Sequence, residues 1–214
     1  METVVLVLTD VQGSTRLWQD ESVAMDAAMA RHHEIVHSAV AEHGGWRPVD
    51  QGEGDAVFAA FRSATEALAA VAQVQRELAA EAWPTSIPLR VRIGIHLGEV
   101  TERGGNLYGD PVNRCARLRG LGAGGQTLLS AAVHEVVRDK LPTGASVTDL
   151  GEHRMKDLTR RQLPRGDCGG YRLVIVGSRS GGVPPTSVQL RQRIVPVKSP
   201  SPSSGLMAPT APEK

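Results

Sequence analysis

Val4-Val-Leu-Val-Leu8 opens the chain and is followed directly by Thr9-Asp-Val-Gln-Gly-Ser-Thr15. Five apolar, mostly β-branched residues in a row are typical of a buried strand. The strand carries Asp10 to its C-terminal end, where a polar turn containing Gly13 leads into a helix. The first N–H groups of a helix favour an anion, and a carboxylate favours a hard cation. The stretch therefore predicts a strand–turn–helix unit suited to a metal-bound phosphate, unless Asp10 is only a turn residue or a helix N-cap.

Composition and charge narrow the class of protein and its partners. The 214 residues are 41% hydrophobic, and 24 basic against 23 acidic residues leave a net charge of +1. This balance gives no reason to expect nucleic acid or an anionic membrane as a partner. No apolar stretch approaches the ~20 residues of a membrane span, and the N-terminus lacks the basic region of a signal peptide. Cys115 and Cys168 lack metal-type spacing, so we expect a cytoplasmic protein with reduced thiols.

The composition changes near Gly177, where Pro, Ser and Gly begin to dominate. Such a segment buries too little apolar surface to offset the entropy of ordering it. We therefore expect residues 1–176 to form one domain and residues 177–214 to be a disordered tail.

Helical and strand patterns alternate within residues 1–176. The expected strands, besides Val4–Leu8, are Trp46–Gln51, Ala56–Phe61, Leu89–Gly98, Thr127–Leu129, Ser146–Leu150 and Tyr171–Val176. The expected helices span Met25–Val40, then start at the capping box Ser63–Glu66, at Asp110-Pro111 and at Ala131. This order fits an α+β fold with a ferredoxin-like split βαβ core, an antiparallel sheet with helices packed on one face.

Five further positions add to the site that Asp10 suggests. Asp55 lies on the turn between two neighbouring strands of the core, so it can approach Asp10. Two converging carboxylates repel unless a cation bridges them, which indicates a divalent metal pair acting on phosphates. Asn113 and Arg117 are spaced i, i+4 and project from one face of a helix. Gln51 and Asn106 precede Asp55 and Asn113 by a few residues each.

With these residues the chain resembles the class III nucleotidyl cyclases, the family of adenylate and guanylate cyclases. The resemblance covers about residues 3–176. The matching segments are Asp10-Val-Gln-Gly-Ser-Thr15, Gly54-Asp55 with Phe58 and Phe61, Ile93-Gly-Ile-His-Leu-Gly98 and Gly109-Asp-Pro-Val-Asn-Arg-Cys-Ala-Arg-Leu118.

The resemblance implies that Asp10 and Asp55 bind two divalent ions, Mg²⁺ or Mn²⁺, with the Val11 carbonyl as an additional ligand. The activity it implies is in-line attack of the ribose 3′-oxygen on the α-phosphorus, with release of pyrophosphate.

The resemblance also implies roles for residues that a partner subunit supplies. Asn113 and Arg117 match the pair that orients the ribose and stabilises charge on the α-phosphate. Lys156 matches a lysine that binds the terminal phosphates, although the glycine pattern around it is absent. The family combines metal ligands from one protomer with these residues from the other, so we expect a head-to-tail homodimer.

The purine-selecting positions depart from the family. Adenylate cyclases commonly have Lys and Asp there and guanylate cyclases Glu and Cys, whereas this chain has Gln51 and Asn106. An amide offers both a donor and an acceptor, so we expect cyclisation of ATP with side activity on GTP. The alternative is a catalytically silent cyclase-homology module that serves dimerisation or regulation.

Two other classes have some support. A ferredoxin-like core can bind RNA, but 3% aromatic residues and a near-neutral charge argue against it. A diguanylate cyclase is suggested by Gly52-Glu-Gly-Asp55, but such an enzyme has no place for the helix carrying Asn113 and Arg117. His32, His33, His37 and His43 crowd one expected helix, and we interpret them as a solvated or partly packed face rather than a metal site.

Overall fold

A computed structural model gives the three-dimensional structure, which describes residues 1–49, 54–143, 145–154, 170–178 and 195–196. The strands are β1 (Glu2–Val11), β2 (Phe58–Phe61), β3 (Val91–Arg103), β4 (Asn106–Tyr108), β5 (Thr127–Leu129), β6 (Ala145–Arg154), β7 (Gly170–Ser178) and β8 (Val195–Pro196). The helices are α1 (Ser14–Asp20), α2 (Ser22–Glu42), α3 (Ala64–Ala80), α4 (Asp110–Leu121) and α5 (Ala131–Val137).

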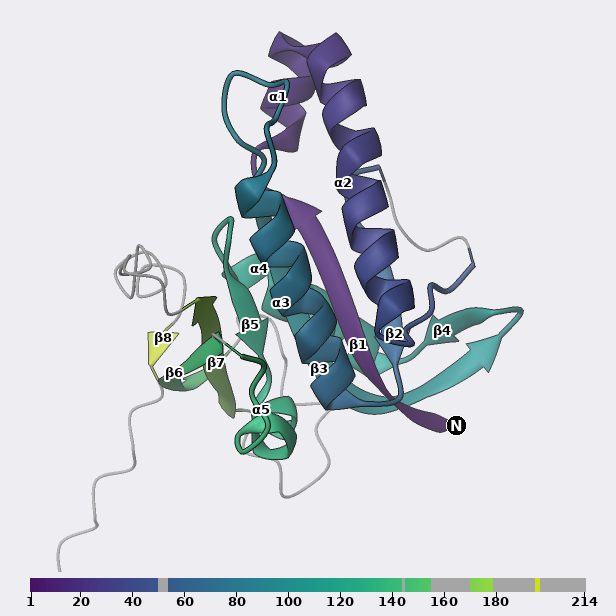
Figure 1. Ribbon diagram of the computed structural model, residues 1–214. Helices are drawn as coiled ribbons and strands as arrows, with labels where there is room; N and C mark the ends of the chain where they lie inside the picture. Colours follow the sequence, from purple (N-terminus) through teal and green to yellow (C-terminus); the bar gives the residue numbers. More distant parts are fainter. Residues whose placement is uncertain (50–53, 144, 155–169, 179–194, 197–214) are drawn as a thin grey trace, which may run out of the picture.

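One sheet in the order β2-β1-β3-β5-β7-β6-β8 organises the chain, and β4 pairs with β3 (Figure 1). The pairs β1–β2 and β1–β3 are antiparallel, as expected, but β5 runs parallel to β3. Of the expected tail, residues 195–196 pair with β6, and nearly all the rest lies outside the described residues. The α+β fold class predicted from the sequence is confirmed, with a mixed rather than a purely antiparallel sheet.

Helices cover both faces of the sheet. α2 and α3 lie over the face turned to the viewer in Figure 1 and enclose the main core. α4 packs on the other face, over a smaller cluster that includes Leu6, Phe58 and Cys115. The expectation that helices cover one face only is therefore wrong, because Gly94 and His96 of β3 are buried beneath α4.

Gly94 explains how α4 approaches so closely. A Cβ atom at this position would lie 2.7 Å from the backbone nitrogen of Arg119 and 2.8 Å from the carbonyl oxygen of Cys115. Only glycine leaves room for the helix backbone there.

The expected strand Trp46–Gln51 is not formed in the described residues. Trp46 makes an isolated bridge to Ala60, and the Val49 N–H donates to the Gly105 carbonyl instead of to β2. Pro48 between them has no N–H to contribute to a sheet. Gln51 itself lies outside the described residues.

The predicted capping box is half formed. Ser63 caps α3 and its hydroxyl accepts a hydrogen bond from the Glu66 N–H at 3.3 Å. The Glu66 carboxylate does not complete the box, because it bonds His43 Nδ1 at 3.0 Å and so ties α3 to α2.

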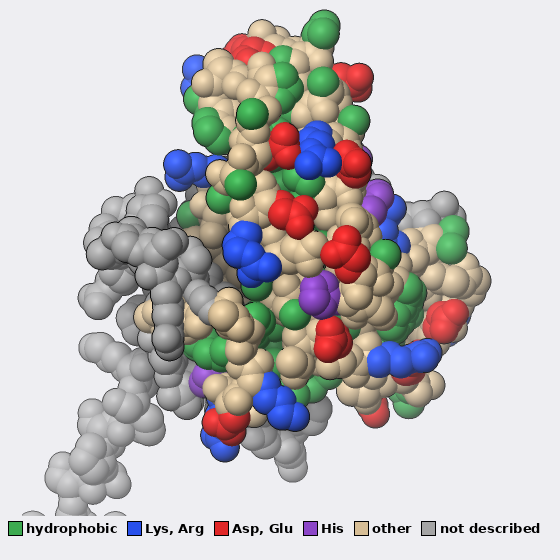
Figure 2. Space-filling view, viewed as in Figure 1, with side chains coloured by type: hydrophobic (Ala, Val, Ile, Leu, Met, Phe, Trp, Pro, Cys, Tyr) green, Lys and Arg blue, Asp and Glu red, His purple; other side chains and the backbone are tan. Residues whose placement is uncertain are grey.

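Charges of both signs are interspersed on the face covered by α2 and α3 (Figure 2). Arg31, for example, pairs with Glu34 and Glu81. The described residues contain no helix that is long and apolar enough to cross a membrane.

Candidate active site at the end of strand β1

Asp10 lies one residue before the end of β1 and faces a cation that the sequence analysis did not single out. The register of β1 and β3 places Asp10 opposite Arg92, and the Arg92 guanidinium donates to the Asp10 carboxylate. Both side chains are largely shielded from solvent, at 27% exposed for Arg92 and 16% for Asp10. Sequence shows Arg92 only as a polar position on an alternating strand, and the strand register was needed to find its partner.

Asp55 reaches the same end of the sheet. β1 and β2 pair with Leu8 opposite Phe58, and the ladder continues beyond β2 because the Thr9 N–H donates to the Val57 carbonyl at 2.9 Å. The Val57 N–H in turn donates to the Thr9 hydroxyl at 2.9 Å. Asp55 lies in the turn two residues before Val57, at this end of the sheet.

The turn after β1 is tied to a distant loop. Gly13 has a left-handed backbone (φ 77°) and starts α1. The Gln12 N–H donates to the Arg90 carbonyl at 2.9 Å, and the Gln12 side chain accepts from the Gly124 N–H. These bonds hold the turn that is predicted to bind a phosphate against the start of β3.

α4 presents its two predicted residues to solvent. Asn113 and Arg117 are exposed, whereas Cys115 and Leu118 are buried. Within the described part of the chain, neither Asn113 nor Arg117 makes a hydrogen bond or ion pair with the aspartates. One protomer therefore leaves them free for another molecule.

Arg119 from the same helix points the other way. Its guanidinium donates to the Thr9 carbonyl at 3.1 Å, so it fixes α4 to the strand that carries Asp10. Nothing in the sequence pattern distinguished Arg119 from its neighbours, because the contact joins residues far apart in the chain.

Asn106 begins β4 and is half-buried. Its Oδ1 atom is buried and finds no hydrogen-bond partner among the described residues. An unpaired buried acceptor of this kind is suited to a ligand donor. The other two predicted substrate-binding residues, Gln51 and Lys156, lie outside the described residues.

The donor set fits magnesium or manganese better than a transition metal. In the portion of the chain described here, no group of three His, Cys, Asp or Glu side chains could hold an ion. Mg²⁺ is commonly held by one or two carboxylates together with substrate phosphates rather than by an all-protein cage. Asp10, Asp55 and the Val11 carbonyl match that pattern.

The histidines of α2 differ from the expectation. His33 and His37 are half-buried and their rings stack, with centroids 5.6 Å apart. His32 is fully buried, so the prediction of a solvated or partly packed position was wrong for this residue. Burial, with a smaller effect of His33, lowers the pKa of His32 to about 4.

Comparison with known proteins supports one family. The sequence profile of the adenylate and guanylate cyclase catalytic domain matches residues 1–173. An uncharacterized protein of Mycobacterium tuberculosis is 43% identical over 158 residues, which cover 74% of this chain and 53% of that protein. A putative adenylate cyclase 3 of Rhizobium meliloti is 31% identical over 158 residues, covering 72% of this chain and 26% of that protein.

Solved structures show the same fold. An adenylate/guanylate cyclase/hydrolase from Silicibacter pomeroyi superimposes with a TM-score of 0.65 at 24% identity, covering 84% of this chain and 98% of that one. The chain spans about half the length of the mycobacterial relative, at 53%.

Proposed function

Because this chain belongs to the family of adenylate and guanylate cyclase catalytic domains, we propose that it cyclises ATP, with side activity on GTP. The products are the 3′,5′-cyclic monophosphate and pyrophosphate. The observation that supports the proposal is the end of β1, where Arg92 of β3 faces Asp10 and the segment that follows Asp55 bonds Thr9. Paired carboxylates with an adjacent cation suit a triphosphate that arrives with divalent ions.

Asp10, Asp55 and the Val11 carbonyl would hold two divalent ions. When bound, such ions lower the pKa of the ribose 3′-hydroxyl and neutralise charge on the departing pyrophosphate. Arg92 is kept at this end of the sheet by Asp10, which places its guanidinium to meet phosphate oxygens.

In this proposal, the residues on α4 contact the substrate from the side opposite the metal ligands. A bond forms between the 3′-oxygen and the α-phosphorus while the bond from that phosphorus to the pyrophosphate oxygen breaks. Asn113 orients the ribose, and Arg117 faces the charge that develops on the α-phosphoryl oxygens. Removing Arg117 should cost about 3 kcal/mol of transition-state stabilisation, roughly a hundredfold in rate.

A homodimer is part of this proposal. Asn113 and Arg117 are exposed and make no described contact with the aspartates of their own chain. A head-to-tail dimer would bring each α4 to the carboxylates of its partner and give two composite sites.

Purine selection rests on amides. The unpaired buried Oδ1 of Asn106 is an acceptor open to a base donor. With Gln51 as a second amide, the pocket can satisfy either purine edge, which supports activity on both nucleotides.

The direct test incubates the purified chain with ATP or GTP in Mg²⁺ and in Mn²⁺ and identifies the products by chromatography. We expect the cyclic monophosphate from both nucleotides and none from Asp10→Ala. Arg114→Ala, on the same helix as Arg117, is the matched control and should retain activity. A folded dimer that forms no product with either metal would favour the silent module instead.

Mixing variants tests the composite site. Asp10→Ala and Arg117→Ala are each nearly inactive in this proposal, but a mixed dimer of the two has one intact site. Random exchange should restore about a quarter of the unmodified activity, since half of the dimers are mixed and each has one of its two sites intact. Absence of any recovery after verified subunit exchange would place all the residues in one chain and contradict the dimeric site.

A further inference from the structure

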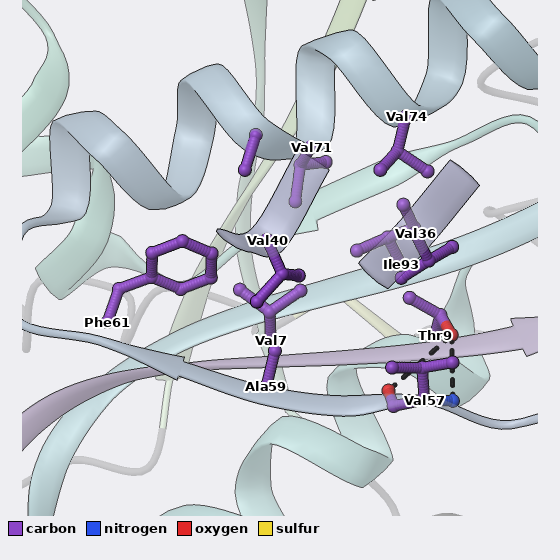
Figure 3. A pocket seen from close by; sticks show the side chains of 11 residues that line it. Val7, Thr9, Val36, Val40, Val57, Ala59, Phe61, Val71, Val74 and Ile93 are labelled. Carbon is purple, nitrogen blue, oxygen red and sulfur yellow. Dashed lines mark hydrogen bonds between the residues drawn. The ribbon is translucent and has the colours of Figure 1, made fainter. Parts of the chain in front are cut away.

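The hydrogen bonding between β1 and the segment before β2 changes at its last pair, Thr9 and Val57. The Thr9 N–H donates to the Val57 carbonyl at 2.9 Å, as in an ordinary antiparallel pair. The bonds among the described residues include no return bond from the Val57 N–H to the Thr9 carbonyl. That N–H donates to the Thr9 hydroxyl at 2.9 Å instead, as Figure 3 shows. The buried threonine side chain therefore replaces its own carbonyl in the ladder.

The Thr9 carbonyl accepts a hydrogen bond from Arg119 of α4 at 3.1 Å. α4 comes within reach because it lies so close to β3 that a Cβ atom on Gly94 would be 2.7 Å from the Arg119 backbone nitrogen. Leu8, the neighbour of Thr9, is opposite Gly94 in the sheet. The Arg119 Nε atom is buried without a partner among the described residues, so the Thr9 carbonyl holds this guanidinium in place. A charged donor makes this bond stronger than the ladder bond that it replaces.

The Thr9 carbonyl belongs to the peptide group that joins Thr9 to Asp10. A peptide group is planar, so fixing its carbonyl also fixes the direction in which the chain continues into the next residue. The residues that follow are Asp10 and Val11, and the proposed metal ligands are the Asp10 carboxylate and the Val11 carbonyl. Arg119 is therefore bonded to the peptide group that carries the first of these ligands.

We propose that Arg119 is a positioning residue for Asp10. Through the Thr9 carbonyl it holds the end of β1 in the orientation that binds divalent cations, and the Thr9 hydroxyl keeps that carbonyl out of the ladder. This inference rests on the proposed function, in which Asp10 is a metal ligand. Loss of a group that orients a metal ligand typically weakens metal affinity 10–100-fold.

The charge of Arg119 makes the sign of the effect diagnostic. A guanidinium beside Asp10 repels a divalent cation, so its removal would tighten cation binding if charge alone mattered. A tether that only fixes α4 to β1 would change the free energy of unfolding and leave the cation affinity of the folded chain unchanged. Weaker cation binding on removal of Arg119 is expected only from a positioning role.

The test measures Mn²⁺ binding to the purified full chain, without nucleotide, by the electron paramagnetic resonance signal of free Mn²⁺. Folded Arg119→Ala should raise the Kd for Mn²⁺ about tenfold or more. Arg119→Lys retains a charged donor and should recover most of that loss. Arg114→Ala removes another arginine of the same helix, whose charge acts on His96, and should leave the Kd within about twofold of the unmodified value.

Thr9→Val tests why the carbonyl is open to Arg119. Valine has the shape of threonine without the hydroxyl, so the Val57 N–H would return to the carbonyl of residue 9 and compete with Arg119. Thr9→Val should therefore raise the Kd for Mn²⁺, and Thr9→Ser, which retains the hydroxyl, should not. Because both substitutions act on one carbonyl, Thr9→Val combined with Arg119→Ala should bind Mn²⁺ no more weakly than Arg119→Ala alone.

Asp10→Asn separates the inference from the proposed function. If Asp10→Asn leaves Mn²⁺ affinity unchanged, the metal site itself is wrong. If Asp10→Asn abolishes binding but folded Arg119→Ala binds Mn²⁺ as tightly as the unmodified chain, or more tightly, the role of Arg119 alone is wrong. Should Arg119→Ala not fold, Thr9→Val decides, and a Kd equal to that of the unmodified chain overturns the proposal.

Discussion

Mild acid should destabilise this protein through two buried histidines, His32 and His96. His32 is 0% and His96 7% exposed, and each has at least one ring nitrogen without a partner in the described residues. Burial lowers the pKa of both to about 4, assisted at His96 by the positive charge of Arg114. Both rings therefore stay neutral in the folded protein under conditions in which they become charged in the unfolded chain.

The direction and size of the effect follow from proton binding. The ordinary pKa of histidine is 6.5, and below this pH the unfolded chain binds protons that the folded state does not bind. The free energy of unfolding therefore falls as the pH drops from 6.5 toward 4. The full pKa difference between the unfolded and folded states corresponds to about 3 kcal/mol of unfolding free energy per histidine. Most carboxylates titrate below pH 5. Between pH 7 and pH 5, each of the two histidines should therefore lower the free energy of unfolding by about 2 kcal/mol.

Urea unfolding at fixed protein concentration, repeated from pH 7 to pH 5, measures this loss. His96→Asn removes one titrating ring and should reduce the decrease in unfolding free energy by about half. The double variant His32→Asn/His96→Asn should keep only a smaller decrease, to which His37 contributes because burial also lowers its pKa. If folded His96→Asn loses as much unfolding free energy between pH 7 and pH 5 as the unmodified chain, His96 does not remain neutral in the folded state. The reasoning from burial would then fail.

Three other substitutions or reagents test the packing. Gly94→Ala should lower the free energy of unfolding by about 1–3 kcal/mol in urea, because its Cβ would lie 2.7 Å from the backbone of α4. A stability equal to that of the unmodified chain would refute the close approach. Ser63→Ala should lower the unfolding free energy by about 1 kcal/mol through loss of the bond from the Glu66 N–H, and a neutral effect would mean the cap is replaced by water. Cys115 is buried, and burial raises its thiol pKa to about 12. After treatment with a thiol reagent, peptide mapping should therefore find Cys115 unmodified until the protein unfolds. Rapid labelling of the native protein would contradict its burial.

Local sequence patterns predicted most of the elements. The apolar run of β1 and the cap at Ser63 are properties of neighbouring residues, and the structure confirms them. Where a prediction was wrong, a distant part of the chain had intervened. Trp46 and the residues after it have the pattern of a strand, but Pro48 cannot donate and Val49 bonds Gly105 instead of β2.

By itself, the sequence determined the family, the α+β class and the identity of the residues expected at the site, because those depend on which side chains occur and at what spacing. Only the tertiary structure showed that Arg92 faces Asp10, that Arg119 fixes α4 to Thr9, and that His32 is fully buried. Each of these depends on strand register or on helix-to-sheet packing. Such contacts join residues far apart in the chain, and their energy arises only when the whole sheet has formed.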